Sequence, residues 1–131
     1  MVSSSATGEE IVPATPAELA SWLADNATGA GRKVHPVGGG TALGYGYPRE
    51  PTGVRLSTLG LTQTIDYPAR DMTITVEAGV RVADLQRTLA TERQRLAVDV
   101  SQAAEATLGG VIATNTSGPR RLGLGTMRDY V

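Results

Sequence analysis

The chain has 131 residues, and its 13 acidic and 12 basic side chains give a formal net charge of -1. This balance argues against a partner such as nucleic acid or an anionic membrane. The absence of cysteine excludes disulfides, thiolate metal sites and an iron–sulfur cluster held by this chain, and a single histidine argues against a histidine metal centre. No apolar run approaches the roughly 20 residues that span a bilayer. Because residues 1–10 also lack the pattern of a signal peptide, we expect a cytoplasmic protein.

A helix is predicted directly after an N-terminal tail, which we place at residues 1–14 and expect to be mobile. Thr15 is a good N-cap, Pro16 fits the first helical position, and Glu18 completes a capping box. The apolar residues at helical spacing, which we expect to pack inward, are Leu19, Trp22 and Leu23.

Three consecutive glycines, Gly38 to Gly40, follow a predicted strand at residues 33–37. Glycine has no Cβ and tolerates positive φ, so such a run lets the backbone curl with its N–H groups facing inward. A concavity of this kind can hold an anion, and a dinucleotide pyrophosphate fits it well. A flexible turn is the alternative interpretation of these residues.

Further strands are predicted at residues 53–57, 63–67 and 72–78, followed by a helix at 82–94 and an extended piece at 96–100. Alternation in the third of these strands predicts one buried face and an antiparallel neighbour, most simply 63–67. The residues expected on the buried face are Met72, Ile74, Val76 and Ala78.

A second glycine site lies in a short predicted helix that Thr107 can cap, because the first turn of this helix carries Gly109 and Gly110. Glycine weakens a helix by up to about 1 kcal/mol relative to alanine, so the pair needs a reason. Close approach of a ligand and tight helix–strand packing are both open. The N–H groups of a helix start also suit phosphate. The polar run at 114–118 either lines a cofactor or forms a turn.

Neither glycine site matches the common nucleotide motifs. Leu43 stands where the Rossmann fingerprint requires glycine, and the only lysine, Lys33, precedes the loop, which excludes a Walker A motif. A dinucleotide bound here would therefore be bound by a different architecture.

The order of these features resembles the FAD-binding domain of the vanillyl-alcohol oxidase and p-cresol methylhydroxylase superfamily. Within it, the chain is most similar to the FAD-binding subunits of bacterial glycolate oxidase, in which a Gly-Pro-Arg-Arg segment leads into an Arg-Asp pair. The resemblance covers residues 34–131 and rests on segments 36–41, 72–80, 83–85, 106–110 and 118–121, on Gly125, and on segment 128–131. It implies an α+β fold of the FAD-binding PCMH type, with a small α/β first subdomain at 15–57 and the beginning of a mixed or antiparallel second subdomain at 58–131, where the chain is truncated.

By this resemblance the chain binds FAD, and the binding is non-covalent because Thr41 follows Gly40 where some members carry a flavin-linked histidine. Residues 37–43 would wrap the pyrophosphate, and the remaining segments would lie along the flavin. The implied cofactor-binding residues are Val37, Gly38, Gly39, Gly40, Thr41, Ala42, Leu43, Ala78, Gly79, Thr107, Leu108, Gly109, Gly110, Asn115, Ser117 and Gly118. We identify no catalytic residue and no metal ligand.

The resemblance further implies a flavin-dependent oxidoreductase that oxidises a small 2-hydroxy acid, such as glycolate, to a 2-oxo acid. Its partners would be another flavin subunit and an iron–sulfur subunit of a glycolate oxidase-like complex, and only these partners would bring it to the inner membrane. Because the family continues beyond the position of Val131, we expect the N-terminal part of a longer flavoprotein or a short form, inactive alone. The alternative is a flavin-free scaffold that acts through partner contacts.

Overall fold

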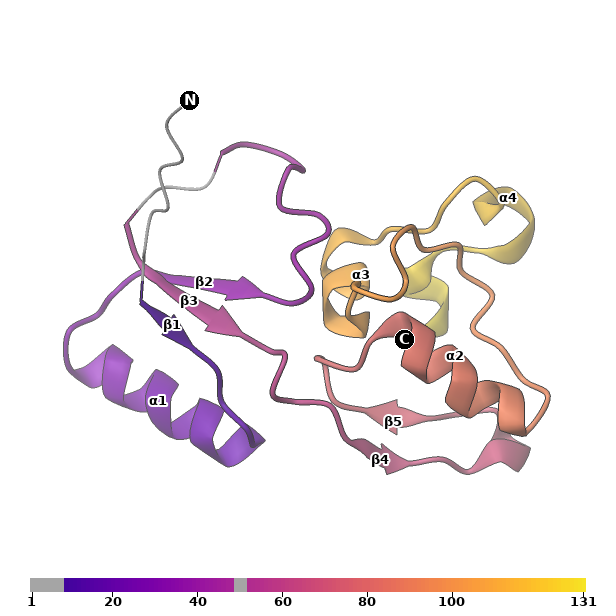
Figure 1. Cartoon of the computed structure of the whole chain (residues 1–131), viewed down its shortest axis with the longest axis horizontal. Helices are drawn as coiled ribbons and strands as arrows, with labels where there is room; N and C mark the ends of the chain where they lie inside the picture. Colours follow the sequence, from indigo (N-terminus) through magenta and orange to yellow (C-terminus); the bar gives the residue numbers. More distant parts are fainter. Residues whose placement is uncertain (1–8, 49–51) are drawn as a thin grey trace.

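The computed structural model describes residues 9–48 and 52–131, so residues 1–8 of the predicted tail lie outside the described residues. The described chain contains two small sheets (Figure 1). In the first, β1 (Glu10–Ile11), β2 (Val34–Val37) and β3 (Val54–Ser57) are parallel in the order β1-β3-β2. In the second, β4 (Thr64–Asp66) pairs antiparallel with β5 (Thr75–Val76). The predicted boundary between residues 57 and 58 stays a prediction.

Strand β1 occupies part of the region that the sequence analysis treated as a mobile tail, so that expectation is wrong for these two residues. Ile11 pairs with Leu56 in the register of the parallel sheet. The main chain just before it is also fixed, because the Arg55 N–H donates to the carbonyl of Glu9 at 2.9 Å. Two neighbouring main-chain contacts therefore order this part of the chain.

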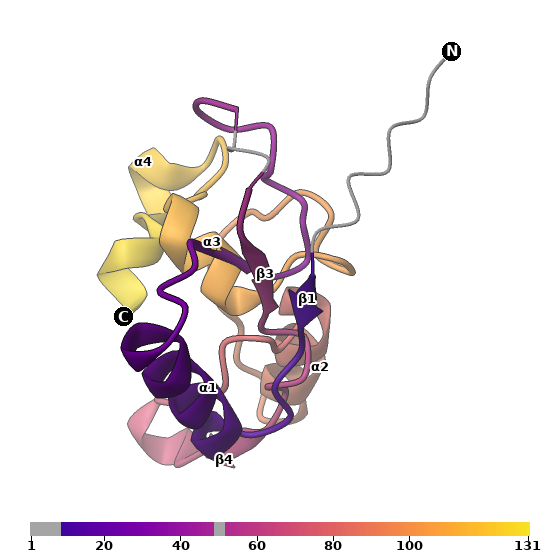
Figure 2. The same cartoon turned by 90° about the vertical axis from the view of Figure 1, so that its left-hand side faces the viewer.

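Helix α1 (Pro16–Thr28) connects β1 to β2 and lies beside the parallel sheet (Figures 1 and 2). Its predicted cap is present, because the Glu18 N–H donates to Thr15 Oγ1 at 3.1 Å. The Glu18 carboxylate reaches one residue further back than expected and accepts from the Ala14 N–H at 2.8 Å. The predicted inward face is only partly covered: Leu19 and Trp22 are half-buried, and Leu23 is 40% exposed.

Residues 58–61, the first part of the connector from β3 to β4, are held on both sides by glycines that bring main chain against main chain. A Cβ on Gly60 would overlap the carbonyl of Pro13, and one on Gly79 would lie 2.6 Å from the carbonyl oxygen of Leu61. The Gly79 N–H donates to that same oxygen at 2.8 Å. Both contacts need a residue without a side chain.

The strand predicted at 72–78 is shorter than expected. Residues Ala69–Asp71 form a 3₁₀ turn (η1), and Met72 adopts the left-handed conformation with φ 56°. This local turn breaks the alternation before β5 begins, which leaves the Met72 side chain 79% exposed. The antiparallel pairing with 63–67 is confirmed, since Thr64 lies opposite Val76.

The expected buried face of that strand is correct for its middle and wrong at both ends. Ile74 and Val76 pack against the core, whereas Met72 and Ala78 are exposed. Glu77, expected to face solvent, is buried because its carboxylate accepts from the Gln63 N–H at 2.8 Å. A buried carboxylate needs such a partner.

Four helical segments follow. Helix α2 (Val82–Thr91) ends three residues before its predicted end because Arg93 has φ 59°, and residues 96–100, predicted as extended, form no strand. The later segments are α3 (Leu108–Thr114), α4 (Arg121–Leu124) and the 3₁₀ turn η2 (Met127–Tyr130). Among the described residues, no helix is both long and apolar enough to cross a membrane.

The core of the second half is aliphatic and consists of two adjoining clusters. The first contains Val82, Val98, Ala106, Val111 and Met127, and the second contains Val80, Leu85 and Leu89. Leu96 and Leu108 pack against both clusters. Helices α2 and α3 are thereby fixed to one another, which sets the position of the second glycine site.

Candidate functional site

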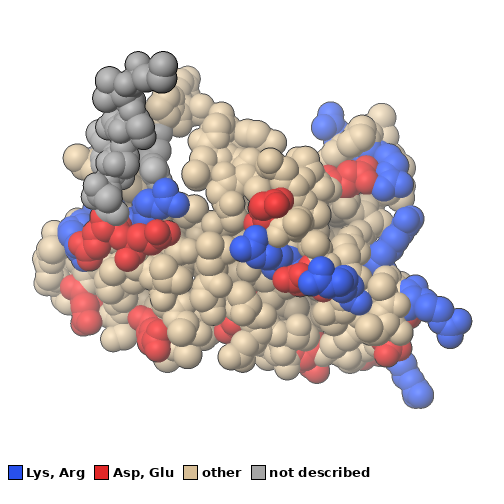
Figure 3. Space-filling view, in the orientation of Figure 1, with Lys and Arg blue, Asp and Glu red and all other residues tan. Residues whose placement is uncertain are grey.

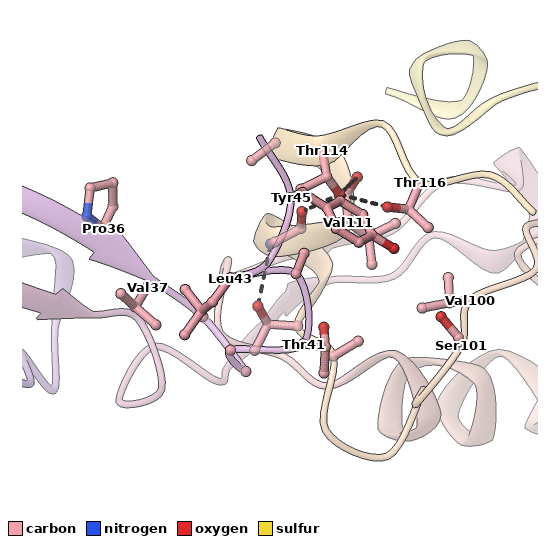
Figure 4. A pocket seen from close by; sticks show the side chains of 18 residues that line it. Pro36, Val37, Thr41, Leu43, Tyr45, Val100, Ser101, Val111, Thr114 and Thr116 are labelled. Atoms are coloured by element: carbon pink, nitrogen blue, oxygen red, sulfur yellow. Dashed lines mark hydrogen bonds between the residues drawn. The ribbon is translucent and has the colours of Figure 1, made fainter. Parts of the chain in front are cut away.

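A cavity of about 210 Å³ lies between the chain that follows β2 and helix α3. Figure 4 shows this cavity from close by. One wall consists of residues 36–43 and Tyr45, and the other of residues 100–101, 106–107 and part of 110–116. Pockets that enclose a whole drug-sized ligand measure roughly 300–1,000 Å³. A cavity of this size therefore fits one part of a large cofactor.

The three glycines after β2 have separate structural reasons. A Cβ on Gly38 would overlap the side chain of Thr107, and one on Gly39 would lie 2.7 Å from the carbonyl carbon of Glu105. These two glycines let the loop lie directly against the chain that leads into α3. Gly40 has φ 75° and open space where a Cβ would point, which makes it the residue that turns the loop.

The main-chain N–H groups of residues 38–42 are free to bind a ligand. Within the part of the chain that the structure describes, none of these five groups donates a hydrogen bond. The hydrogen bonds of this region begin again at Leu43, whose N–H points to the carbonyl of Gly40, and at Tyr45, whose N–H donates to the carbonyl of Ala42 at 3.0 Å. All five residues line the cavity, so the loop offers successive donors of the kind that hold an anion.

The first three N–H groups of α3, by contrast, are already used within the described chain. The Leu108 N–H donates to the carbonyl of Val80 at 2.8 Å, and the Gly109 N–H donates to the carbonyl of Ala78 at 2.9 Å. The Gly110 N–H donates to Thr107 Oγ1 at 3.3 Å, as the predicted cap requires. The expectation that this helix start suits phosphate is therefore wrong, because the fold itself uses each of these groups.

The sequence left open whether the two glycines of α3 serve tight packing or close approach of a ligand, and the structure gives each glycine a different role. A Cβ on Gly109 would lie 2.9 Å from both the Cβ and the carbonyl oxygen of Ala78, which is tight packing against the chain before α2. Gly110 lines the cavity, and a Cβ there would meet only Thr107 Oγ1, at 3.2 Å. Gly109 serves the fold, and Gly110 leaves room in the cavity.

The cavity wall at Val100 and Ser101 follows directly after an ion pair between Asp99 and Arg120. Nε of Arg120 donates to Oδ2 of Asp99 at 2.9 Å and to Oδ1 at 3.1 Å, and Nη2 also donates to Oδ1. These hydrogen bonds hold the pKa of the Asp99 carboxyl below its usual value and raise the pKa of Arg120.

The polar run after α3 connects this helix to η2. The Arg128 N–H donates to Oδ1 of Asn115 at 3.2 Å, and the Met127 N–H donates to Oγ of Ser117 at 3.0 Å. Asn115 ends α3 in the left-handed conformation, with φ 49°. Asn115 and Ser117 thus have structural roles, while the intervening Thr116 lines the cavity.

A second carboxylate outside the cavity, that of Asp129, is also held by hydrogen bonds. Asp129 accepts from the Thr126 N–H at 2.6 Å and from the Thr126 hydroxyl at 3.0 Å, and these bonds lower the pKa of its carboxyl. No described residue that lines the cavity carries a charge. In Figure 3 the upper part of the surface around the loop after β2 is largely tan, while red and blue side chains gather at the centre of the face below it. An anion in the cavity would therefore be attracted by main-chain donors.

The structure brings nine of the residues singled out from the sequence around the cavity: Val37, Gly38, Gly39, Gly40, Thr41, Ala42, Leu43, Thr107 and Gly110. Seven do not line it: Ala78, Gly79, Leu108, Gly109, Asn115, Ser117 and Gly118. Thr114 and Thr116 also line it, as one of the two interpretations of the run at 114–118 allowed, whereas Tyr45, Val100 and Ser101 were not anticipated (Figure 4). Because Tyr45 follows the glycine loop closely in the sequence, it could have been predicted to line the cavity. The sequence around Val100 and Ser101 contains no pattern that predicts their position in the wall.

Known proteins share both the sequence and the fold of this chain. It is 40% identical over 106 residues to a D-lactate dehydrogenase of Archaeoglobus fulgidus, and this alignment covers 78% of this chain and 23% of that protein. It is 32% identical over 98 residues to a D-2-hydroxyglutarate dehydrogenase of Xanthomonas citri pv. viticola, and this alignment covers 75% of this chain and 21% of that protein. A structure of alkyldihydroxyacetonephosphate synthase in P1 superposes with a TM-score of 0.75 at 25% identity, over 92% of this chain and 24% of that one.

The chain spans about a quarter or less of the length of these relatives. A family model described as an FAD binding domain matches residues 10–131. This match and the structural similarity confirm the predicted α+β fold of the FAD-binding PCMH type and the predicted cofactor, FAD. The chain therefore belongs to the FAD binding domain family.

Proposed function

We propose that this chain is the FAD-binding part of a flavin-dependent oxidoreductase that converts a 2-hydroxy acid to the corresponding 2-oxo acid. The relatives named above as dehydrogenases of D-lactate and D-2-hydroxyglutarate support the substrate class, because both compounds are 2-hydroxy acids. The observation that carries the binding role is that residues 38–42 all line one cavity and that none of their five N–H groups donates a hydrogen bond to another described residue.

The free donors at residues 38–42 would hold the pyrophosphate of FAD. An anion at this loop would be bound by main-chain groups that are already in place, so little reorganisation accompanies binding. The start of α3 would pack beside the cofactor through Gly110 without donating to it. This assignment restricts the pyrophosphate site to the first glycine loop.

FAD bound here would supply the oxidising power for the reaction, in which the C–OH group of the substrate loses two electrons and two protons and becomes C=O. The residues described here bind and orient the cofactor, since no aspartate, glutamate, histidine or lysine lines the cavity. The hydroxyl groups of Thr41, Ser101 and Thr116 can donate to or accept from polar atoms of the cofactor. We assign no catalytic residue to this chain.

The flavin would be held without a covalent bond. Thr41 follows Gly40 at the place where a histidine would be needed for attachment, and no histidine lines the described cavity. Denaturation of the coloured protein in acid should therefore release all of the flavin into the supernatant, as measured by absorbance. Flavin that stays with the precipitated protein would contradict this proposal.

The finer assignment that we propose is to a glycolate oxidase-like complex with another flavin subunit and an iron–sulfur subunit. It is supported by the Gly118–Arg121 segment, Gly-Pro-Arg-Arg, followed by Arg128 and Asp129, on which the resemblance in the sequence rests. Purification of the chain from its own cells should recover subunits that carry flavin and iron. Recovery of the chain as a homogeneous single species in those cells would reject the complex.

The binding role is tested by purification of the chain and titration with FAD. We expect an absorbance band near ~450 nm in the protein fraction and an increase in thermal stability with FAD concentration, equivalent to about 2.7 kcal/mol at one hundred times the Kd. ADP, which also carries a pyrophosphate, should compete with FAD, whereas riboflavin, which has no phosphate, should compete more weakly. A colourless protein that FAD does not stabilise would reject the proposed function and favour a flavin-free scaffold.

A further inference from the structure

One wall of the cavity consists of a segment without regular secondary structure. Val100 and Ser101 line the cavity, and residues 97–100 lie in no helix, strand or hydrogen-bonded turn. Val98 is buried in the first core cluster and holds the segment from one side. The position of the two lining residues therefore depends on side-chain contacts that fix the chain just before them.

The ion pair between Asp99 and Arg120 is a further contact on this segment, in which Val100 also packs against the first core cluster. The side chain of Asp99 is 24% exposed and accepts from Nε and Nη2 of Arg120. Gly118 brings the two chains together, because it has φ 68° and a Cβ there would lie 2.8 Å from the carbonyl oxygen of Asp99. The planar guanidinium matches a carboxylate with several hydrogen bonds, which makes this contact directional.

The pair joins two segments that both line the cavity. Asp99 immediately precedes Val100 and Ser101, and Arg120 follows Thr116 by four residues. Neither Asp99 nor Arg120 lines the cavity itself. The adjacent Arg121 is exposed and makes no ion pair within the described residues, which makes it a matched comparison.

We propose that Asp99 and Arg120 are positioning residues for FAD: their ion pair fixes Val100 and Ser101 relative to Thr116 and thereby sets the shape of one wall of the cavity. This inference rests on the proposed role of the cavity in FAD binding. Loss of the ion pair should therefore lower the affinity for FAD. Loss of a surface ion pair that only stabilises the fold would leave this affinity unchanged.

The test compares FAD titrations of the chain with those of the variants Arg120→Ala, Arg120→Lys and Arg121→Ala. We expect Arg120→Ala to raise the Kd for FAD roughly three- to tenfold, which is the usual range for residues that act through their neighbours. Lysine keeps the charge but loses the fork geometry, so Arg120→Lys should restore part of the affinity. Arg121→Ala should bind FAD like the wild type.

Two further measurements separate positioning from stability. Thr15→Ala removes the cap of α1, far from the cavity in the sequence, and should lower the melting temperature without changing the Kd for FAD. Hydrogen exchange at residues 97–101 should become faster in Arg120→Ala than in Arg121→Ala. An unchanged Kd in Arg120→Ala, or an equal rise in Thr15→Ala, would overturn the inference, whereas a wild type that binds no FAD would overturn the proposed function and this inference together.

Discussion

Replacement of Gly110 by alanine should separate cofactor binding from fold stability. Alanine is favoured over glycine within a helix by up to about 1 kcal/mol. The added Cβ would meet only Thr107 Oγ1, at 3.2 Å, and the small shift needed there offsets part of this gain. We therefore expect the unfolding free energy of Gly110→Ala to stay within about 0.5 kcal/mol of the wild type. The same methyl group would occupy room in the cavity, so the Kd for FAD should rise about tenfold.

The adjacent Gly109 provides the matched control, because its missing side chain serves packing. A Cβ there would lie 2.9 Å from two atoms of Ala78, so Gly109→Ala should lower the unfolding free energy by about 1–3 kcal/mol. Urea unfolding followed by circular dichroism measures stability, and the change in flavin fluorescence on titration measures affinity. If Gly110→Ala bound FAD as tightly as the wild type at unchanged stability, the placement of the cofactor beside α3 would be wrong.

Three other variants test different parts of the structure. Gly39→Ala should lower the unfolding free energy by about 1–3 kcal/mol in urea, because a Cβ there would lie 2.7 Å from a main-chain carbon of the opposite segment. Tyr45 lines the cavity and is 61% exposed, whereas Tyr47 is 98% exposed and does not line it, so Tyr45→Ala should weaken FAD binding about tenfold through lost ring contacts and Tyr47→Ala should not. Because hydrogen bonds lower the pKa of the carboxyls of Asp99 and Asp129, both groups stabilise the fold above about pH 4, and this contribution is lost as the pH falls through their folded pKa values. Asp99→Asn should accordingly lose less stability than the wild type between pH 5 and pH 3, and an equal loss in both proteins would contradict the assignment.

The sequence predicts the parts of this fold that are governed by local rules. The caps at Thr15 and Thr107 and the antiparallel pairing of 63–67 with the following strand are present as predicted. Each depends on residues within a few positions of one another, where capping and alternation leave a clear pattern. The wrong faces at Met72 and Glu77 come from a turn at Ala69–Asp71 and a distant hydrogen bond, which alternation alone does not report.

The candidate site could be predicted only in part, because its two walls lie about sixty residues apart in the sequence. The glycine pattern identified both walls. Whether a given glycine serves packing or leaves room for a ligand, however, depends on the residues that lie against it in the fold. Gly38 and Gly39 face the chain before α3, and Gly109 faces Ala78, so three of these five glycines serve contacts within the protein. The donors at the start of α3 are likewise consumed by distant carbonyl groups, at Val80 and Ala78, that no local pattern reveals.

The connector at residues 58–61 has a consequence for how the cofactor arrives. Since Gly60 and Gly79 bring this short stretch against neighbouring main chain on both sides, it can move only if these close contacts separate. We therefore expect the two walls of the cavity to keep their relative position when a nucleotide binds, so that little free energy is spent on reorganisation. We accordingly expect analogues that differ only slightly from FAD in shape to bind with clearly lower affinity than FAD itself.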